Sequence, residues 1–192
     1  MKVIGLTGPI GSGKSEASKT LRKLDAYVIE ADTIGHELFQ PQTKVWSRLV
    51  QEFGSEILQS EGKINRRKLA GLVFSDPKKL KTLNSITHPY IRQKIEEEIN
   101  SCKKLSSSFK FVVVDAALPE LFEGLVDETW VVYAPKEKRV KRLMQSGFTK
   151  TEINRRMKSQ PSQKEYSKIA DKLLKNDKSI QKLNGQIYAF LA

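Results

Sequence analysis

The chain lacks the features that mark secreted and membrane proteins. Cys102 is the only cysteine among 192 residues, so no disulfide can form within the chain. No segment resembles a secretion signal, and no run of about 20 apolar residues is present. Internal repeats and low-complexity tracts are also missing. These absences predict a cytoplasmic, globular protein with no membrane partner.

Acidic residues are scarce as well. The sequence has 22 Asp and Glu against 34 Lys and Arg, which gives a formal net charge of +12. This surplus favours polyanionic partners, but charge alone does not choose among nucleotides, nucleic acids and anionic lipids. The remaining composition is ordinary, with 39% hydrophobic and 29% charged residues. A chain of this length is expected to form one core with inserted subdomains.

A phosphate-binding motif follows the first apolar stretch. Residues 8–15 fit the pattern G-x-x-x-x-G-K-[ST], and residues 3–7 before them predict a buried strand. Glycines let backbone N–H groups turn towards a triphosphate, while the next helix points its positive end at the same anion. A turn that only caps a helix has no use for the Lys-Ser pair. The predicted ATP-binding loop comprises Gly8, Pro9, Ile10, Gly11, Ser12, Gly13, Lys14 and Ser15. Within it, Lys14 is expected to neutralise the β- and γ-phosphates and to act in catalysis.

Strands alternate with helices along much of the chain. Apolar runs predict strands near 2–7, 27–30, 109–115, 129–133 and 172–174. Helical periodicity covers 14–24, 136–160 and a closing segment from Ile180 to Leu191. This alternation predicts an α/β fold with a doubly wound parallel sheet.

One long interruption divides the pattern. From 33 to 108 the periodicity is helical, which predicts an inserted helical subdomain. A basic, polar stretch over 136–167 precedes the last strand, and we expect a helical lid there. The α/β core then comprises 1–32, 109–135 and 168–192.

Acidic side chains follow two of the predicted strands. Asp32 follows the second strand and Asp115 ends the third, so both are expected at the carboxyl edge of the sheet. Phosphoryl transfer needs a metal, an anion cradle and a base that orients the acceptor, although NTP hydrolysis fits the same features. The alternative for Asp32 is a helix N-cap before Thr33. For Asp115 we favour support of Mg²⁺, together with Ser15, over a structural cap.

The pair His88-Pro89 predicts the start of a helix that runs to about Asn100, because proline is favoured at the first helical position. Thr87 or His88 would then cap this helix. The same helix start, with Arg92 one turn later, would also suit a substrate phosphate. The residues leave both interpretations open.

Several motifs, in order along nearly the whole chain, resemble those of the dephospho-CoA kinase family. The phosphate loop and residues 28–32 are similar to the opening of that family. Residues 53–74 and 83–89 resemble its helical CoA-binding region. The lid, the last strand and the adenine loop are matched by Arg156-Met157 with Gln160, and by Ala170-Asp171 followed by Asn176.

The resemblance implies a P-loop kinase fold in which 33–108 binds CoA and 136–167 forms the lid. It implies transfer of the γ-phosphate of ATP, with Mg²⁺, to the ribose 3′-hydroxyl of dephospho-CoA, the last step of coenzyme A synthesis. Asp32 matches the acceptor base and Asn176 the adenine loop. We assign His88 and Arg92, with Asp32, to substrate binding.

The sequence departs from the family pattern mainly in the lid. Ser146 stands where the family usually carries an arginine, a second family arginine is missing near Tyr166, and Lys178 stands where a glycine is common. The loop over 115–123 is also slightly longer than usual.

Because those arginines are missing, we expect Arg142 to be the principal lid arginine and to act in catalysis, with Arg139, Lys141 or Arg155 sharing the charge. The alternative for Arg142 is a solvated helix face.

Three other functions fit part of the sequence. A GTPase would explain the phosphate loop, and 32–35 fits D-x-x-G, but no N-K-x-D motif occurs. A kinase for another acceptor, such as a nucleoside monophosphate, would differ mainly in the helical insertion. A basic nucleic-acid-binding protein would use the net charge, but RNA-binding and zinc motifs are missing. We therefore expect ATP and dephospho-CoA as partners and no stable nucleic-acid partner, while the oligomeric state is not predicted.

Overall fold

The computed structural model describes residues 1–105 and 109–192. Residues 106–108, with which the predicted helical subdomain ends, lie outside this part of the chain. The chain forms two compact units, one from Met1–Glu30 and Glu96–Ala192 and the other from Ala31–Ile95. The predicted division into core, CoA-binding subdomain and lid is functional, and it stays a prediction.

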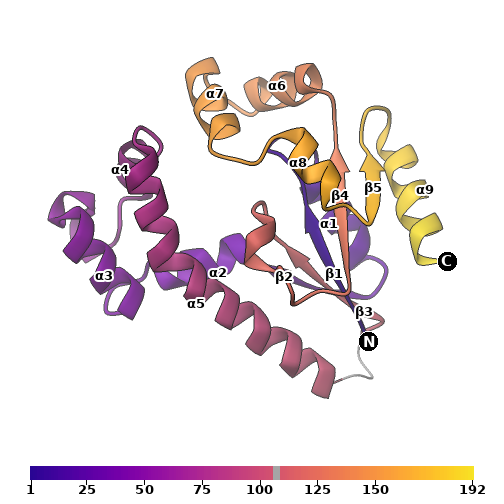
Figure 1. Ribbon diagram of the computed structural model, residues 1–192, viewed down its shortest axis with the longest axis horizontal. Coiled ribbons are helices and arrows are strands. Elements are labelled where there is room, and N and C mark those ends of the chain that lie inside the picture. The colour runs from indigo at the N-terminus through magenta and orange to yellow at the C-terminus, as the bar shows by residue number, and fades with distance from the viewer. Residues whose placement is uncertain (106–108) are drawn as a thin grey trace. The chain divides into compact units, whose positions relative to one another are not determined.

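A parallel sheet organises the first unit (Figure 1). Its strands are β1 (Lys2–Thr7), β2 (Ala26–Glu30), β3 (Phe111–Asp115), β4 (Glu128–Tyr133) and β5 (Lys172–Lys175). They lie in the order β2-β3-β1-β4-β5, and every neighbouring pair is parallel. The predicted strands and the doubly wound α/β fold are thus confirmed. Strand β3 begins at Phe111 rather than at 109 because Lys2 and Ala26, the first residues of its neighbours, pair with Phe111.

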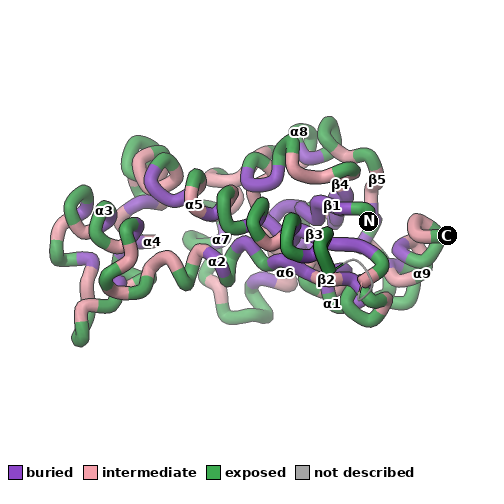
Figure 2. Tube along the Cα trace, turned by 90° about the horizontal axis from the view of Figure 1, so that it is seen from below, coloured by how far each residue is buried: buried purple, intermediate pink, exposed green. Residues whose placement is uncertain are grey.

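Strands β1, β2 and β3 are buried along most of their length, whereas β5 at the edge of the sheet has one buried residue, Leu174 (Figure 2). On one face Ile4 and Leu6 pack with Leu21 of α1 (Lys14–Arg22) and Leu183 of α9 (Ile180–Leu191). On the other face Gly5 leaves room for Phe122, because a Cβ at Gly5 would lie 2.5 Å from the Phe122 ring. Parallel strands that are covered on both faces have continuous apolar sequences, and for this reason the sequence pattern predicted their positions.

Three helices follow β4 in the region predicted as a lid. They are α6 (Lys136–Gln145), α7 (Lys150–Lys158) and α8 (Gln163–Lys168). The helical stretch predicted over 136–160 is divided into α6 and α7, because Gly147 adopts a φ of 86° and Thr149 caps a new helix. Thr149 and Glu152 form a capping box that satisfies the first N–H groups of α7.

A short 3₁₀ turn, Pro119–Leu121, lies between β3 and β4.

The second unit is helical, as predicted for the insertion. Its elements are α2 (Ala31–Leu38), α3 (Lys44–Phe53), α4 (Arg66–Val73), the larger part of α5 (Pro77–Lys104), and the 3₁₀ turns Ser55–Ile57 and Ser60–Gly62. Leu49, Leu69 and Ile86 belong to its apolar core. None of the described helices is long and apolar enough to cross a membrane.

The predicted helix start at His88-Pro89 is wrong. Helix α5 runs from Pro77 to Lys104 and passes through Pro89. Pro89 offers no N–H to the Ser85 carbonyl, but both residues are exposed, so water can solvate that carbonyl. Ile86 and Ile91 are buried on either side. Packing of these two isoleucines therefore outweighs the local preference of proline for a helix start.

Candidate active site

The phosphate loop connects β1 to α1 and depends on its glycines. Gly13 has a φ of 92°, in the left-handed region, and a Cβ there would clash with the side-chain amide of Asn176. A Cβ at Gly8 would lie 2.5 Å from the carbonyl oxygen of Val132. These positions therefore require glycine for both backbone conformation and space.

Side chains from the last strand and the lid hold the loop by its backbone. Asn176, which is 5% exposed, donates from Nδ2 to the Ser12 carbonyl at 2.8 Å. Arg142 donates to the carbonyls of Gly11, Ser12 and Asn176 at 3.3, 3.1 and 2.9 Å. The Gln160 side-chain oxygen accepts from the Ile10 N–H at 2.8 Å. The predicted ATP-binding residue Asn176 thus contacts the loop, and so does the predicted lid arginine.

The anion-facing groups of the loop are left available. Within the described residues, the N–H groups of Gly11 and Gly13 donate no hydrogen bond to protein. The N–H groups of Lys14 and Ser15 lie in the first turn of α1, where a helix cannot satisfy them. Such a cluster of N–H groups at a helix N-terminus suits a phosphate.

Two of the predicted site residues, Lys14 and Asp115, are brought together, in a pairing that the sequence did not predict. The Lys14 ammonium forms an ion pair with the Asp115 carboxylate at the carboxyl end of β3. Asp115 is 9% exposed, whereas Ser15 is exposed on α1. The Ser15 hydroxyl and the Asp115 carboxylate are oxygen donors of the kind that Mg²⁺ prefers. Among the described residues no group of three or more His, Cys, Asp or Glu could hold a metal. A Mg²⁺ ion here would therefore take most of its ligands from phosphate and water.

Tyr166, near which the family usually carries an arginine, is a packing residue. Its hydroxyl donates to the Ala117 carbonyl at 2.7 Å, and the Thr7 hydroxyl donates to the same carbonyl at 3.1 Å. Burial raises the pKa of Tyr166, and the nearby Glu120 charge adds to the shift. Tyr166 therefore ties α8 to the loop after β3. Ser146, by contrast, is exposed at the end of α6.

The remaining predicted site residues lie in the helical unit. Asp32 is exposed in the first turn of α2. The alternative that it is an N-cap before Thr33 is wrong, because α2 already begins at Ala31. His88 and Arg92 lie one turn apart within α5, both half-buried. Because α5 passes through these positions, no helix N-terminus lies beside them to bind a substrate phosphate.

One residue at the site was not singled out by sequence reasoning. Arg139 is 7% exposed and donates from Nη1 to the Ile10 carbonyl at 3.4 Å. The sequence pattern indicates Arg139 only as one of several basic residues of the lid. Its spacing of four residues from Leu143, which is also buried, is the signal that places it on the inner face of α6.

Comparison with known proteins agrees with these features along the whole chain. A family model for dephospho-CoA kinase matches residues 2–182. A dephospho-CoA kinase from Carboxydothermus hydrogenoformans is 40% identical over 197 residues, covering 100% of this chain and 93% of the relative.

Solved structures give the same result. A Thermus thermophilus protein, TT1252, is 33% identical with a TM-score of 0.79, covering 99% of this chain and 96% of that one. A dephospho-CoA kinase from Campylobacter jejuni is 29% identical with a TM-score of 0.68, covering 100% of this chain and 96% of that one. The chain belongs to the dephospho-CoA kinase family.

Proposed function

We propose that this chain transfers the γ-phosphate of ATP to the ribose 3′-hydroxyl of dephospho-CoA, which yields coenzyme A and ADP. The family match over residues 2–182 carries the proposal, because it includes both the phosphate loop and the helical unit. The pairing of Lys14 with Asp115 beside the loop supports ATP as the donor.

Each predicted site residue has a role in this reaction. The loop N–H groups and Lys14 bind the phosphates, and the Asp115 carboxylate holds the Lys14 side chain until phosphate oxygens compete for its ammonium. Ser15 and Asp115 would hold Mg²⁺, which would supply positive charge to offset the negative charge of the phosphates. Asp32 takes the proton of the 3′-hydroxyl as the oxygen attacks the γ-phosphorus and ADP leaves.

The lid and the helical unit supply the remaining contacts. Arg142 provides positive charge for the transferred phosphoryl group from its position against the loop. His88 and Arg92 bind the acceptor through their side chains. Asn176 fixes the loop next to the ATP site. The cytoplasmic location and the lack of a stable nucleic-acid partner stay predictions.

The test is whether ATP consumption depends on the acceptor. ADP release is measured with Mg²⁺ and dephospho-CoA, AMP, dCMP or no acceptor. We expect ADP release well above the blank only with dephospho-CoA, because a site completed by its acceptor hydrolyses ATP slowly when alone. Activity with AMP or dCMP but not with dephospho-CoA would make the chain a kinase for another acceptor. Equal ADP release in all four reactions would indicate an NTP hydrolase.

A further inference from the structure

A pocket of about 280 Å³ lies beside the phosphate loop, between α6, α7 and the segment that leads into α8. Pro9 of the loop forms part of its wall, and Lys136, Arg139 and Lys158 bring three cationic side chains to it. Among the described residues that line the pocket, none carries a carboxylate. All of them belong to the same compact unit. The pocket is therefore positively charged and has no anion of its own.

Arg139 is the unusual member of this lining. Its guanidinium has five N–H donors. Within the described residues it makes one side-chain hydrogen bond, to the Ile10 carbonyl at 3.4 Å, and its Nε is buried without a partner. Burial lowers the pKa of Arg139, and Tyr166, Tyr133 and Glu137 offset only part of that shift. A buried cation with so few partners costs free energy unless something outside the chain compensates it.

Anchoring of the loop does not explain this arginine. Arg142, one turn further along α6, already donates to the Gly11, Ser12 and Asn176 carbonyls. Gln160 satisfies the Ile10 N–H at 2.8 Å. The single long bond from Arg139 adds little to these contacts.

We propose that this pocket binds a phosphate group, held by Arg139, Lys136 and Lys158. Its volume lies just below the range of about 300 to 1,000 Å³ typical of drug-sized ligands, so it suits one or two phosphate groups rather than a whole nucleotide. Two sources offer this chemistry, namely the terminal phosphate of a bound nucleotide and a free phosphate ion. The nucleotide source rests on the proposed function, whereas the free ion does not.

Calorimetric titration with inorganic phosphate and pyrophosphate tests the proposal. The proteins are wild type, Arg139→Gln, Lys158→Gln and the matched control Lys150→Gln, which removes the same charge from an exposed position outside the pocket. Because the phosphate loop itself attracts phosphate, each titration is repeated with saturating ADP. We expect the Kd to rise about tenfold or more in Arg139→Gln, since a charged hydrogen bond is lost. Lys150→Gln should stay within about twofold of wild type, because Lys150 does not line the pocket.

Nucleotide affinities then separate the two sources. If the pocket receives the terminal phosphate, Arg139→Gln weakens ATP binding and leaves ADP binding unchanged. If it binds a free ion, both nucleotides bind as in wild type and only phosphate binding in the presence of ADP is lost. Unchanged binding of phosphate, ATP and ADP in Arg139→Gln would overturn the proposal, as would an equal loss in Lys150→Gln. Phosphate binding that depends on Arg139, in a protein that does not phosphorylate dephospho-CoA, would overturn only the proposed function.

Thermal unfolding separates ligand binding from a structural role. Without phosphate, the Tm of Arg139→Gln should equal or exceed that of wild type, because an uncompensated buried charge is gone. With phosphate, the wild-type Tm should rise and that of Arg139→Gln should not. A lower Tm with an undiminished response to phosphate would show a structural role. If Arg139→Gln does not fold, phosphate binding by Lys158→Gln tests the proposal instead. Unchanged phosphate binding in Lys158→Gln would then overturn it.

Discussion

At the scale of single residues, Lys14 and Asp32 differ in burial and in their partners. Lys14 is held beside the phosphate loop by its ion pair with Asp115, which is itself almost buried. Asp32 is exposed in the first turn of α2, where its carboxylate is accessible to an acceptor hydroxyl. An exposed carboxylate suits proton transfer, whereas a paired ammonium suits a permanent phosphate contact.

Replacement of these two residues should therefore affect different steps. Lys14→Ala should weaken ATP binding and turnover together, because the lysine contacts phosphates in both the ground state and the transition state. Asp32→Asn should leave ATP binding nearly intact and lower kcat by roughly 10²- to 10⁴-fold, towards the lower end because phosphoryl transition states are loose. Calorimetry and steady-state kinetics give the two quantities. An equal loss of ATP affinity in both variants would contradict the role of Asp32 as a base.

At the scale of elements, α6 presents two arginines to the phosphate loop. Arg142 contacts the Gly11 and Ser12 carbonyls, and Arg139 contacts the Ile10 carbonyl. Helix α7, by contrast, carries Arg155 on its exposed side. A contribution to catalysis from the lid is therefore expected from α6 rather than from α7.

Substitution of each arginine tests this expectation. Arg142→Ala should lower kcat by about 10³- to 10⁵-fold, as for other arginines that stabilise a transferred phosphoryl group. The Tm should fall as well, because the Gly11, Ser12 and Asn176 carbonyls lose a hydrogen-bond donor. Ser146→Arg should leave activity unchanged or raise it. Steady-state kinetics on Arg142→Ala, Arg139→Ala and Arg155→Ala provide the comparison. A loss below about fivefold for Arg142→Ala, with a larger loss for one of the others, would remove Arg142 from the catalytic residues.

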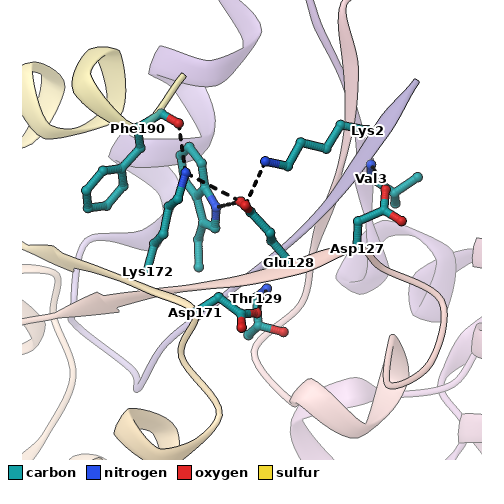
Figure 3. A network of polar contacts seen from close by, with 9 residues as sticks. Lys2, Val3, Asp127, Glu128, Thr129, Asp171, Lys172 and Phe190 are labelled. Atoms are coloured by element: carbon teal, nitrogen blue, oxygen red, sulfur yellow. Dashed lines mark hydrogen bonds and ion pairs between the residues drawn. The ribbon is translucent and has the colours of Figure 1, made fainter. Parts of the chain in front are cut away.

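The amino ends of the strands, opposite the phosphate loop, carry a separate polar network (Figure 3). Glu128 at the start of β4 forms an ion pair with Lys2 at 2.7 Å and accepts from the Trp130 indole at 2.8 Å. Lys172 of β5 lies 3.6 Å from the same carboxylate and donates to the Phe190 carbonyl at 2.8 Å. The network thus links β1, β4, β5 and α9 at the edge where no chemistry is proposed.

This network makes stability depend on pH. The hydrogen bond from Lys2, followed by that from Trp130, lowers the pKa of Glu128 from its ordinary value of 4.5. A lowered pKa in the folded state gives stability that is present above pH 4.5 and lost as the pH falls through the folded pKa. The Tm of Glu128→Gln should therefore lie below that of wild type at pH 7, and the gap should close in acid. Thermal unfolding against pH measures the gap, with exposed Glu96→Gln as control. A gap that does not change with pH would contradict the ionic contribution.

At the scale of the whole molecule, the net charge of +12 favours an anionic partner. The charge alone does not distinguish a nucleotide from a nucleic acid. The dependence of binding on the phosphate loop does distinguish them. The loop binds a nucleotide through specific residues, whereas binding to a general basic surface depends mainly on the salt concentration.

Mg²⁺ and ATP should therefore raise the Tm of the wild-type chain, and Lys14→Ala should lose most of that rise. At a ligand concentration of about 100 times Kd, binding to the folded state adds about 2.7 kcal/mol to the free energy of unfolding. Differential scanning fluorimetry with ATP and with an oligonucleotide, each at low and high salt, makes the comparison. Stabilisation by the oligonucleotide that disappears with salt and does not need Lys14 would indicate a nucleic-acid-binding protein.

The phosphate loop, the strands and the position of Asp115 were all predictable from the sequence. Each is a local signal, because a loop that wraps phosphate needs glycine at positions such as Gly13, and a strand buried on both faces needs an unbroken apolar run. The ordered motifs of the dephospho-CoA kinase family added the acceptor, which local signals do not specify. To this extent the chain's own residues determined the family, the sheet and the predicted donor.

Only the tertiary structure decided which side chains lie against one another. In the tertiary structure α5 continues through Pro89, because the burial of Ile86 and Ile91 outweighs the preference of proline for a helix start. The tertiary structure also placed Arg139 in a pocket with few partners and Arg142 against the loop carbonyls, although both are basic residues of the same helix. Burial and partnership depend on segments that are distant in sequence, so a helical pattern can indicate a face but not what that face contacts.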